Sequence, residues 1–85
     1  MRDTHRLQVV KAAEDNGWSR VGTPHYDVFH RTVNGQSSEV TVTYFEGSQR
    51  IAGARIGDPG RSDRYPARPG QRLADVLGWL NAPGG

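Results

Sequence analysis

The dipeptide Asn34-Gly35 separates two segments in which polar and apolar residues alternate, and this arrangement constrains the fold more than any other feature of the chain. The two segments are YDVFHRT, residues 26–32, and EVTVTYF, residues 39–45. Alternation with a period of two is typical of β-strands, and Asn-Gly is a strong signal for the turn of a β-hairpin. A third strand-like segment, QRIAGARI, follows Gly47-Ser48. The sequence therefore predicts three antiparallel strands.

The residues before the first strand predict a helix. Asp3 or Thr4 can cap its start, and Asn16-Gly17 is a stop signal of the left-handed C-cap kind. Trp18 directly follows the stop and is expected to fold back on the helix. The inward side of this helix is expected to carry Leu7, Val9 and Val10.

The C-terminal segment, residues 69–85, predicts a second helix. Its apolar residues recur at i, i+3, i+4 and i+7 and form one stripe made of Leu73, Val76, Leu77 and Leu80. The order helix, strand, strand, strand, helix predicts an α+β fold. We expect a two-layer sandwich in which both helices cover one face of a three-stranded antiparallel sheet and leave the other face open.

The first hairpin can form in two registers. A two-residue loop at Asn34-Gly35 pairs Phe29 with Val40 and buries Asp27 in the core. A type I turn with Gly35 as a bulge instead turns Asp27 and Phe29 outward. Because burial of an unpaired carboxylate costs several kcal/mol, we predict the second register.

In that register the open face carries the predicted partner-binding residues. They are Phe29, Arg31, Thr41, Thr43 and Phe45. The third strand adds to this face either Ala52, Ala54 and Ile56, which complete an apolar patch, or Ile51, Gly53 and Arg55, which leave it solvated. The length of the loop at Gly47-Ser48 decides between them, and the sequence leaves both open.

A second candidate surface is the segment GDPGRSDRYPARPG, residues 57–70, which precedes the last helix. Arginines recur in it at spacings of three and four around a tyrosine, a combination that binds phosphates or carboxylates and stacks on bases. The predicted nucleic-acid-binding or anion-binding residues are Arg61, Arg64, Tyr65 and Arg68.

Length and composition narrow the class of protein. The 85 residues suit a single domain spanning 1–85, and the absence of cysteine excludes disulfides and thiolate metal sites. The N-terminal segment is charged where a signal peptide is apolar, and no stretch approaches the roughly 20 apolar residues of a membrane span. We therefore expect a soluble cytoplasmic protein. Its net charge of +2 is too small to indicate nucleic-acid binding by itself.

No motif in the chain indicates catalysis. His25 and His30 are five residues apart, a separation that places them on opposite faces of a regular strand, and His5 lies on the first helix. No nucleophile elbow, phosphate-binding loop or dinucleotide fingerprint is present. The sequence predicts a protein that is not an enzyme and that holds no metal or small-molecule cofactor.

Two resemblances extend this interpretation. The element order, and the spacing of four between His25, Phe29 and Val33, resembles the double-stranded-RNA-binding domain, but Gly53 and Gly57 stand where that family has its basic helix. The whole chain, with its NGW helix end, its Asn-Gly hairpin and its closing LADVLGWL segment, resembles small accessory proteins of actinobacteria and their bacteriophages. That resemblance implies a host-directed protein that works by binding.

We therefore expect a non-enzymatic interaction module. Its expected partner is a host protein, bound through the open face or the arginine-containing loop. A homodimer that forms through the open face is the other arrangement that the sequence leaves open. The alternative function is nucleic-acid binding through the loop at residues 57–70.

Overall fold

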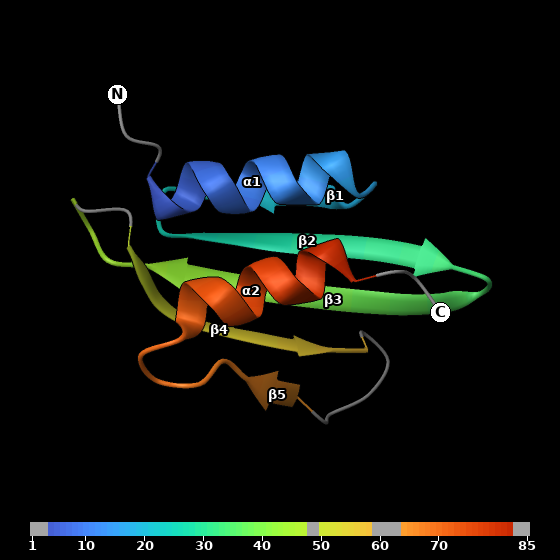
Figure 1. Cartoon of the computed structure of the whole chain (residues 1–85). Coiled ribbons are helices and arrows are strands. Elements are labelled where there is room, and N and C mark those ends of the chain that lie inside the picture. Colours follow the sequence, from blue (N-terminus) through green and yellow to red (C-terminus); the bar gives the residue numbers. More distant parts are fainter. Residues whose placement is uncertain (1–3, 48–49, 59–63, 83–85) are drawn as a thin grey trace.

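The computed structural model describes residues 4–47, 50–58 and 64–82. Its elements, in chain order, are α1 (His5–Asp15), β1 (Ser19–Gly22), β2 (Tyr26–Val33), β3 (Gln36–Tyr44), β4 (Ile51–Gly57), β5 (Arg64–Pro66) and α2 (Arg72–Asn81). The strands form one antiparallel sheet in the order β1-β2-β3-β4-β5. In Figure 1, α1 lies in front of β1 and runs alongside β2, and α2 lies in front of β3 and β4.

The α+β class is confirmed, but the prediction of three strands was wrong. The sheet has five strands because β1 and β5 extend it at its two edges. β1 has four residues and β5 has three, so neither is long enough to display a period of two in the sequence. β5 lies inside the segment 57–70, which was expected to be a loop.

The signals at the two ends of α1 act as predicted. Thr4 Oγ1 accepts a hydrogen bond from the Leu7 amide at 3.1 Å. At the other end Gly17 has a φ of 77°, and the Trp18 amide donates to the Ala13 carbonyl at 3.0 Å, which is the pattern of a Schellman cap. This cap returns the Trp18 ring to the core, where its Nε1 donates to the Leu80 carbonyl at 3.0 Å.

The core lies between the helices and the sheet. Its buried apolar residues are Val9, Ala13, Trp18, Phe29, Val40, Val42, Tyr44, Ile51, Val76 and Leu80. The stripe on α2 is confirmed, with two of its members buried and two partly buried. On α1 the expectation for Leu7 was wrong, because it is exposed. Helical geometry places Leu7 about 200° around the axis from buried Val9, on the solvent side.

The predicted register of the first hairpin was wrong. Asn34 and Gly35 have φ values of 53° and 80°, as a two-residue type I′ turn requires. The strands consequently pair Phe29 with Val40 and Asp27 with Val42. Phe29 is 0% exposed and belongs to the core, so it does not lie on the open face.

The third strand of the prediction, now β4, turns Gly53 and Arg55 to the open face, because they pair with Thr43 and Thr41. The register shifts between Thr43 and Tyr44, so that Ile51 pairs with Tyr44 and is buried. This bulge combines parts of both alternatives: the open face is largely polar, while Ile51 still contributes to the core.

Candidate functional site

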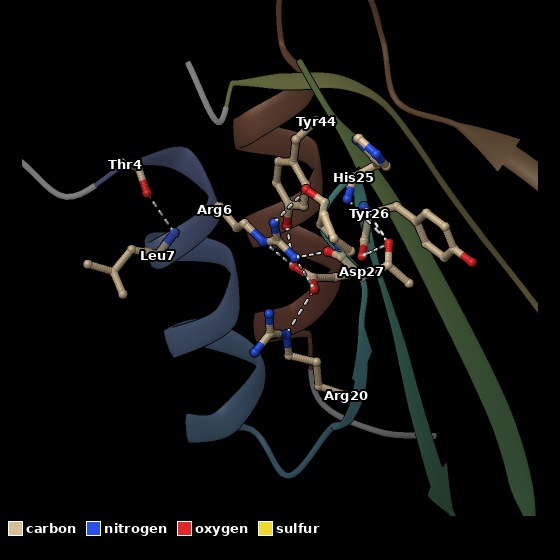
Figure 2. Close-up of polar contacts among 10 residues, drawn as sticks. Thr4, Arg6, Leu7, Arg20, His25, Tyr26, Asp27 and Tyr44 are labelled. Carbon is tan, nitrogen blue, oxygen red and sulfur yellow. Dashed lines mark hydrogen bonds and ion pairs between the residues drawn. The ribbon is translucent and has the colours of Figure 1, made fainter. Parts of the chain in front are cut away.

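A buried carboxylate at the start of β2 determines which residues reach the open face. Asp27 is 0% exposed. It accepts hydrogen bonds from Arg6 Nε and Nη2 at 3.2 and 3.0 Å, from Arg20 Nε at 2.9 Å and from the Tyr44 hydroxyl at 2.9 Å (Figure 2). Two guanidinium groups therefore balance this carboxylate, and its burial does not leave an uncompensated charge. We call these four residues the Asp27 cluster.

Tyr44 supplies a neutral donor to this cluster. Burial, together with the hydrogen bond to the Asp27 carboxylate, raises the pKa of Tyr44 well above its ordinary value. The phenol therefore keeps its proton at physiological pH. The guanidinium of Arg6 also lies over the Tyr44 ring, with Cζ 4.9 Å from the ring centroid.

The bend between β1 and β2 packs against the Asp27 cluster. Thr23 Oγ1 accepts a hydrogen bond from the Tyr26 amide at 3.1 Å, and Arg6 donates to the carbonyls of Thr23 and Pro24. A Cβ added to Gly22 would lie only 2.9 Å from Asp27 Oδ1, so the absence of a side chain there makes room for the carboxylate. Residues 22–25, GTPH, therefore form a bend that α1 holds through Arg6.

Because Asp27 points toward the helices, its neighbours Tyr26 and Val28 point the opposite way. Figure 2 shows the Tyr26 ring directed away from the Asp27 cluster. Val28 pairs with Val21 of β1, so the two valines share the same face. Val21 is 59% exposed, Tyr26 is 41% exposed and Val28 is half-buried. We call these three residues the open-face patch.

A hollow adjoins the open-face patch over β3, β4 and β5. It has a volume of about 460 Å³, and its lining includes Thr41, Thr43, Gly53, Arg55 and Pro66. Gly53 leaves open space where a side chain would stand, since a Cβ there would meet nothing within 4 Å. The Arg55 guanidinium makes no hydrogen bond or ion pair with any residue that the structure describes. The open-face hollow therefore offers two hydroxyl groups and one cation to a ligand.

One ion pair also lies on this face. His30 Nδ1 is 3.6 Å from Glu39 Oε2, and the two residues pair across β2 and β3. The pair lies next to Val28 and Thr41 on the same face of the sheet.

The structure brings together only part of the predicted partner-binding set. Thr41 and Thr43 line the open-face hollow. Arg31 was expected on the open face but faces the helices, where its Cζ lies 4.4 Å from the centroid of the Trp18 ring and its Nη2 donates to the Ala82 carbonyl at 3.0 Å. Phe45 is exposed, as predicted, but it lines a separate pocket with residues of α1 and α2.

Arg31 and Phe29 were misplaced for the same reason. They lie on one side of β2 with Asp27, so a register chosen to keep the carboxylate in water turned all three outward. The true register turns all three inward, where Arg31 stacks on Trp18 and Phe29 packs in the core.

The described part of the arginine-containing loop holds an ion pair. Arg68 Nη2 and Nε donate to Asp75 at 2.7 and 3.0 Å, and its amide donates to the same carboxylate at 2.9 Å. The side-chain and backbone hydrogen bonds from Arg68 lower the pKa of Asp75 to about 2. Tyr65 is 68% exposed and Arg64 begins β5, whereas Arg61 lies outside the described residues. One predicted anion-binding arginine therefore already holds a carboxylate from its own chain.

Comparison with protein-family models, with curated proteins and with solved structures found no match. The described residues contain no group of three or more histidine, aspartate or glutamate side chains placed to hold a metal ion. Neither described helix is long and apolar enough to cross a membrane. Inference about function therefore rests on the geometry of the surfaces.

Two residues of the open-face patch, Val21 and Tyr26, were not among the predicted binding residues. Val21 stands in a strand too short to recognise. The predicted register, by turning Asp27 and Phe29 outward, turned Tyr26 inward. The missed signal was the pair of arginines, Arg6 and Arg20, that accompany Asp27. Arg6 shares the first turn of α1 with its N-cap, and Arg20 stands seven residues before Asp27.

Proposed function

We propose that this protein is a non-enzymatic interaction module that binds a partner protein through the open face of its sheet. The observation that supports this most is the open-face patch. Val21 and Tyr26 expose apolar surface on either side of Val28, on the face turned away from both helices. Tyrosine is enriched at protein interfaces because its ring buries a large area while its hydroxyl keeps a hydrogen bond.

The edge strand β1 adds a second element to this surface. β1 pairs only with β2 among the described strands, and all four of its residues are exposed. The outer edge of such a strand offers backbone donors and acceptors to an incoming strand. A partner that adds a strand at β1 would bury Val21 and approach Tyr26 in the same step.

The open-face hollow supplies charge to the proposed interface. Arg55 and the two threonine hydroxyls favour a partner with an acidic side chain at that position. The resemblance to accessory proteins of actinobacteria and their phages favours a bacterial host protein as this partner, met in the cytoplasm. A second copy of the chain is the other occupant that the same surface could take.

Nucleic-acid binding through Arg61, Arg64, Tyr65 and Arg68 is the alternative function. The exposed ring of Tyr65 favours it, since such a ring can stack on a base. The ion pair between Arg68 and Asp75 weighs against it, because a phosphate would have to compete with that carboxylate. We therefore place this function second.

Two tyrosines provide a matched test of the two surfaces. Tyr26 lies on the open face, whereas Tyr65 pairs with Ile56 and so lies on the opposite face of the sheet. The protein is immobilised, a bacterial host lysate is passed over it, and the retained protein is identified by mass spectrometry and purified. We expect Tyr26→Ser to raise the Kd for that protein about tenfold or more, and Tyr65→Ser to change it less than about twofold.

The opposite ranking of the two variants would reject the open face as the binding surface. Binding to duplex DNA or RNA is measured in parallel as a function of salt. If the arginines contact phosphates, log K falls against log salt with a slope near −0.9 per contact, and the triple change of Arg61, Arg64 and Arg68 to serine flattens it. Tight duplex binding at physiological salt that this triple variant loses would establish the alternative.

Sedimentation of the free protein distinguishes binding of a second copy from binding of a host protein. If the open face binds another copy, the wild type sediments as a dimer and Tyr26→Ser as a monomer. If it binds a host protein, both sediment as monomers.

A further inference from the structure

A pocket of about 320 Å³ lies at the end of the molecule where α1 and α2 both begin. In Figure 1 the first turns of the two helices lie at the same end of the sheet as the end of β3 and the start of β4. The Phe45 amide donates to the Arg50 carbonyl at 2.8 Å, so the chain remains paired beyond the last residue of β3. The pocket is therefore framed by paired strands and by the first turns of both helices.

One part of the pocket lining is apolar. It consists of Phe45, Ile51 and Leu73. Ile51 is buried and Leu73 packs against the core, so these two side chains have fixed surroundings. Phe45, in contrast, is 53% exposed, although it is one of the largest apolar side chains of the protein. A ligand with a short apolar group would cover this ring and remove its surface from water.

The polar part of the lining carries two cationic side chains. They are Arg50 and Arg72, His5 also lines the pocket, and the described lining residues include no carboxylate. Arg72 makes no hydrogen bond or ion pair with the described residues, in contrast to Arg68, whose guanidinium holds Asp75. A guanidinium group binds a carboxylate or a phosphate with two parallel hydrogen bonds. An anionic group is therefore the complement of this side of the pocket.

We propose that this pocket binds a small organic anion in which a carboxylate or a phosphate is attached to a short apolar group. The apolar group packs on Phe45 and Leu73, and the anion accepts hydrogen bonds from Arg72. The volume lies at the small end of the range of about 300–1,000 Å³ that ligand pockets occupy, so it suits a small ligand such as one aromatic ring that carries the anionic group. This site is separate from the open-face patch, so an experiment that rejects one of the two proposals leaves the other standing.

Titrations monitored by the backbone amide signals of the isotope-labelled full chain test this proposal. The probes are 3-phenylpropionate, phenyl phosphate, the neutral alcohol 3-phenylpropanol and inorganic phosphate. We expect saturable shifts at the amides of Phe45, Ile51 and Leu73 with the two organic anions, at Kd values of about 1 mM or below. The alcohol lacks the anionic group and inorganic phosphate lacks the apolar group. Each should therefore bind about tenfold more weakly or worse. The tighter of the two organic anions identifies the anionic group.

Two arginine variants provide the matched comparison. Arg72→Gln should weaken the tighter anion about fivefold or more, whereas Arg55→Gln, the same change on the open face, should leave its Kd within about twofold. Unchanged positions of distant amide signals verify that both variants are folded. Equal binding of the alcohol and the anion, equal effects of the two variants, or no saturation by either organic anion up to about 10 mM would overturn the proposal.

Discussion

The Asp27 cluster allows a strong prediction, because one uncharged replacement removes its only negative charge and half of its acceptor capacity. In Asp27→Asn the shape of the side chain is kept, but the negative charge that balances Arg6 and Arg20 is lost. In the wild type, each oxygen of the Asp27 carboxylate accepts two of the four hydrogen bonds. The amide group of asparagine can accept at one oxygen only, so its NH₂ group faces donors on the other side.

The magnitude follows from these contacts. Removing one partner from a buried ion pair costs about 3–5 kcal/mol, because the remaining charges stay buried without compensation. Arg20 is 40% exposed and can turn partly to water, so we expect a value near the lower end, about 3 kcal/mol. An 85-residue domain has a total free energy of unfolding of about 4–13 kcal/mol, so the variant loses a large share of its stability.

Urea unfolding followed by tryptophan fluorescence measures this loss, since Trp18 is buried in the native state. With a slope of about 1.2 kcal/mol per molar urea, a loss of 3 kcal/mol lowers the midpoint by about 2.5 M. Asp15→Asn is the matched control, because Asp15 is exposed at the end of α1 and should shift the midpoint by less than about 0.5 M. A midpoint for Asp27→Asn within that same margin of the wild type would refute the electrostatic account of the cluster.

Three further predictions follow from the fold. Phe29→Ser should cost about 4 kcal/mol in thermal or urea unfolding and Val28→Ser about 1 kcal/mol, because only the first opens the core; the reverse order would restore the rejected hairpin register. The pKa of Asp75 in the folded protein lies below its ordinary value of 3.8, so its pairing with Arg68 stabilises the fold above about pH 4 and this contribution disappears as the pH falls toward 2. The difference in Tm between the wild type and Asp75→Asn should shrink over that range, and a difference that stays constant would contradict the pairing. Gly17→Ala should cost about 1 kcal/mol in the same urea assay, since its φ of 77° is unfavourable for alanine, and an unchanged midpoint would argue against the cap.

Local signals of the sequence determined the elements of this protein. The threonine at position 4, the Asn16-Gly17 stop and the stripe on α2 each act within one or two turns of a helix, where the backbone hydrogen bonds depend on neighbouring residues. The Asn34-Gly35 turn is also local, and it appears where the sequence placed it. These signals were sufficient for the α+β class and for the approximate positions of the longer elements, although β3 begins three residues earlier than expected.

The residues of the candidate site depended on contacts that are distant in the sequence. Whether Asp27 can be buried is decided by Arg6, 21 residues earlier, and by Tyr44, 17 residues later. With those partners the carboxylate is compensated, and without them its burial would be prohibitive. A one-residue change of register exchanges the two faces of a strand, so this single electrostatic question decided the positions of Phe29 and Tyr26 together.

The division between local signals and tertiary contacts also holds for the two edge strands and for the arginines. β1 and β5 are too short to show a pattern, and they become strands because β2 and β4 offer them hydrogen-bonding partners. By charge alone Arg68 and Arg72 are equivalent, yet Arg68 holds Asp75 whereas Arg72 lines a pocket. The sequence by itself determined the longer elements, because local hydrogen bonding and periodicity depend on residues that are close together in the chain. Only the tertiary structure decided which charges are compensated and which remain available to a ligand, because the Coulomb energy of a charge depends on neighbours that the fold brings within a few ångströms.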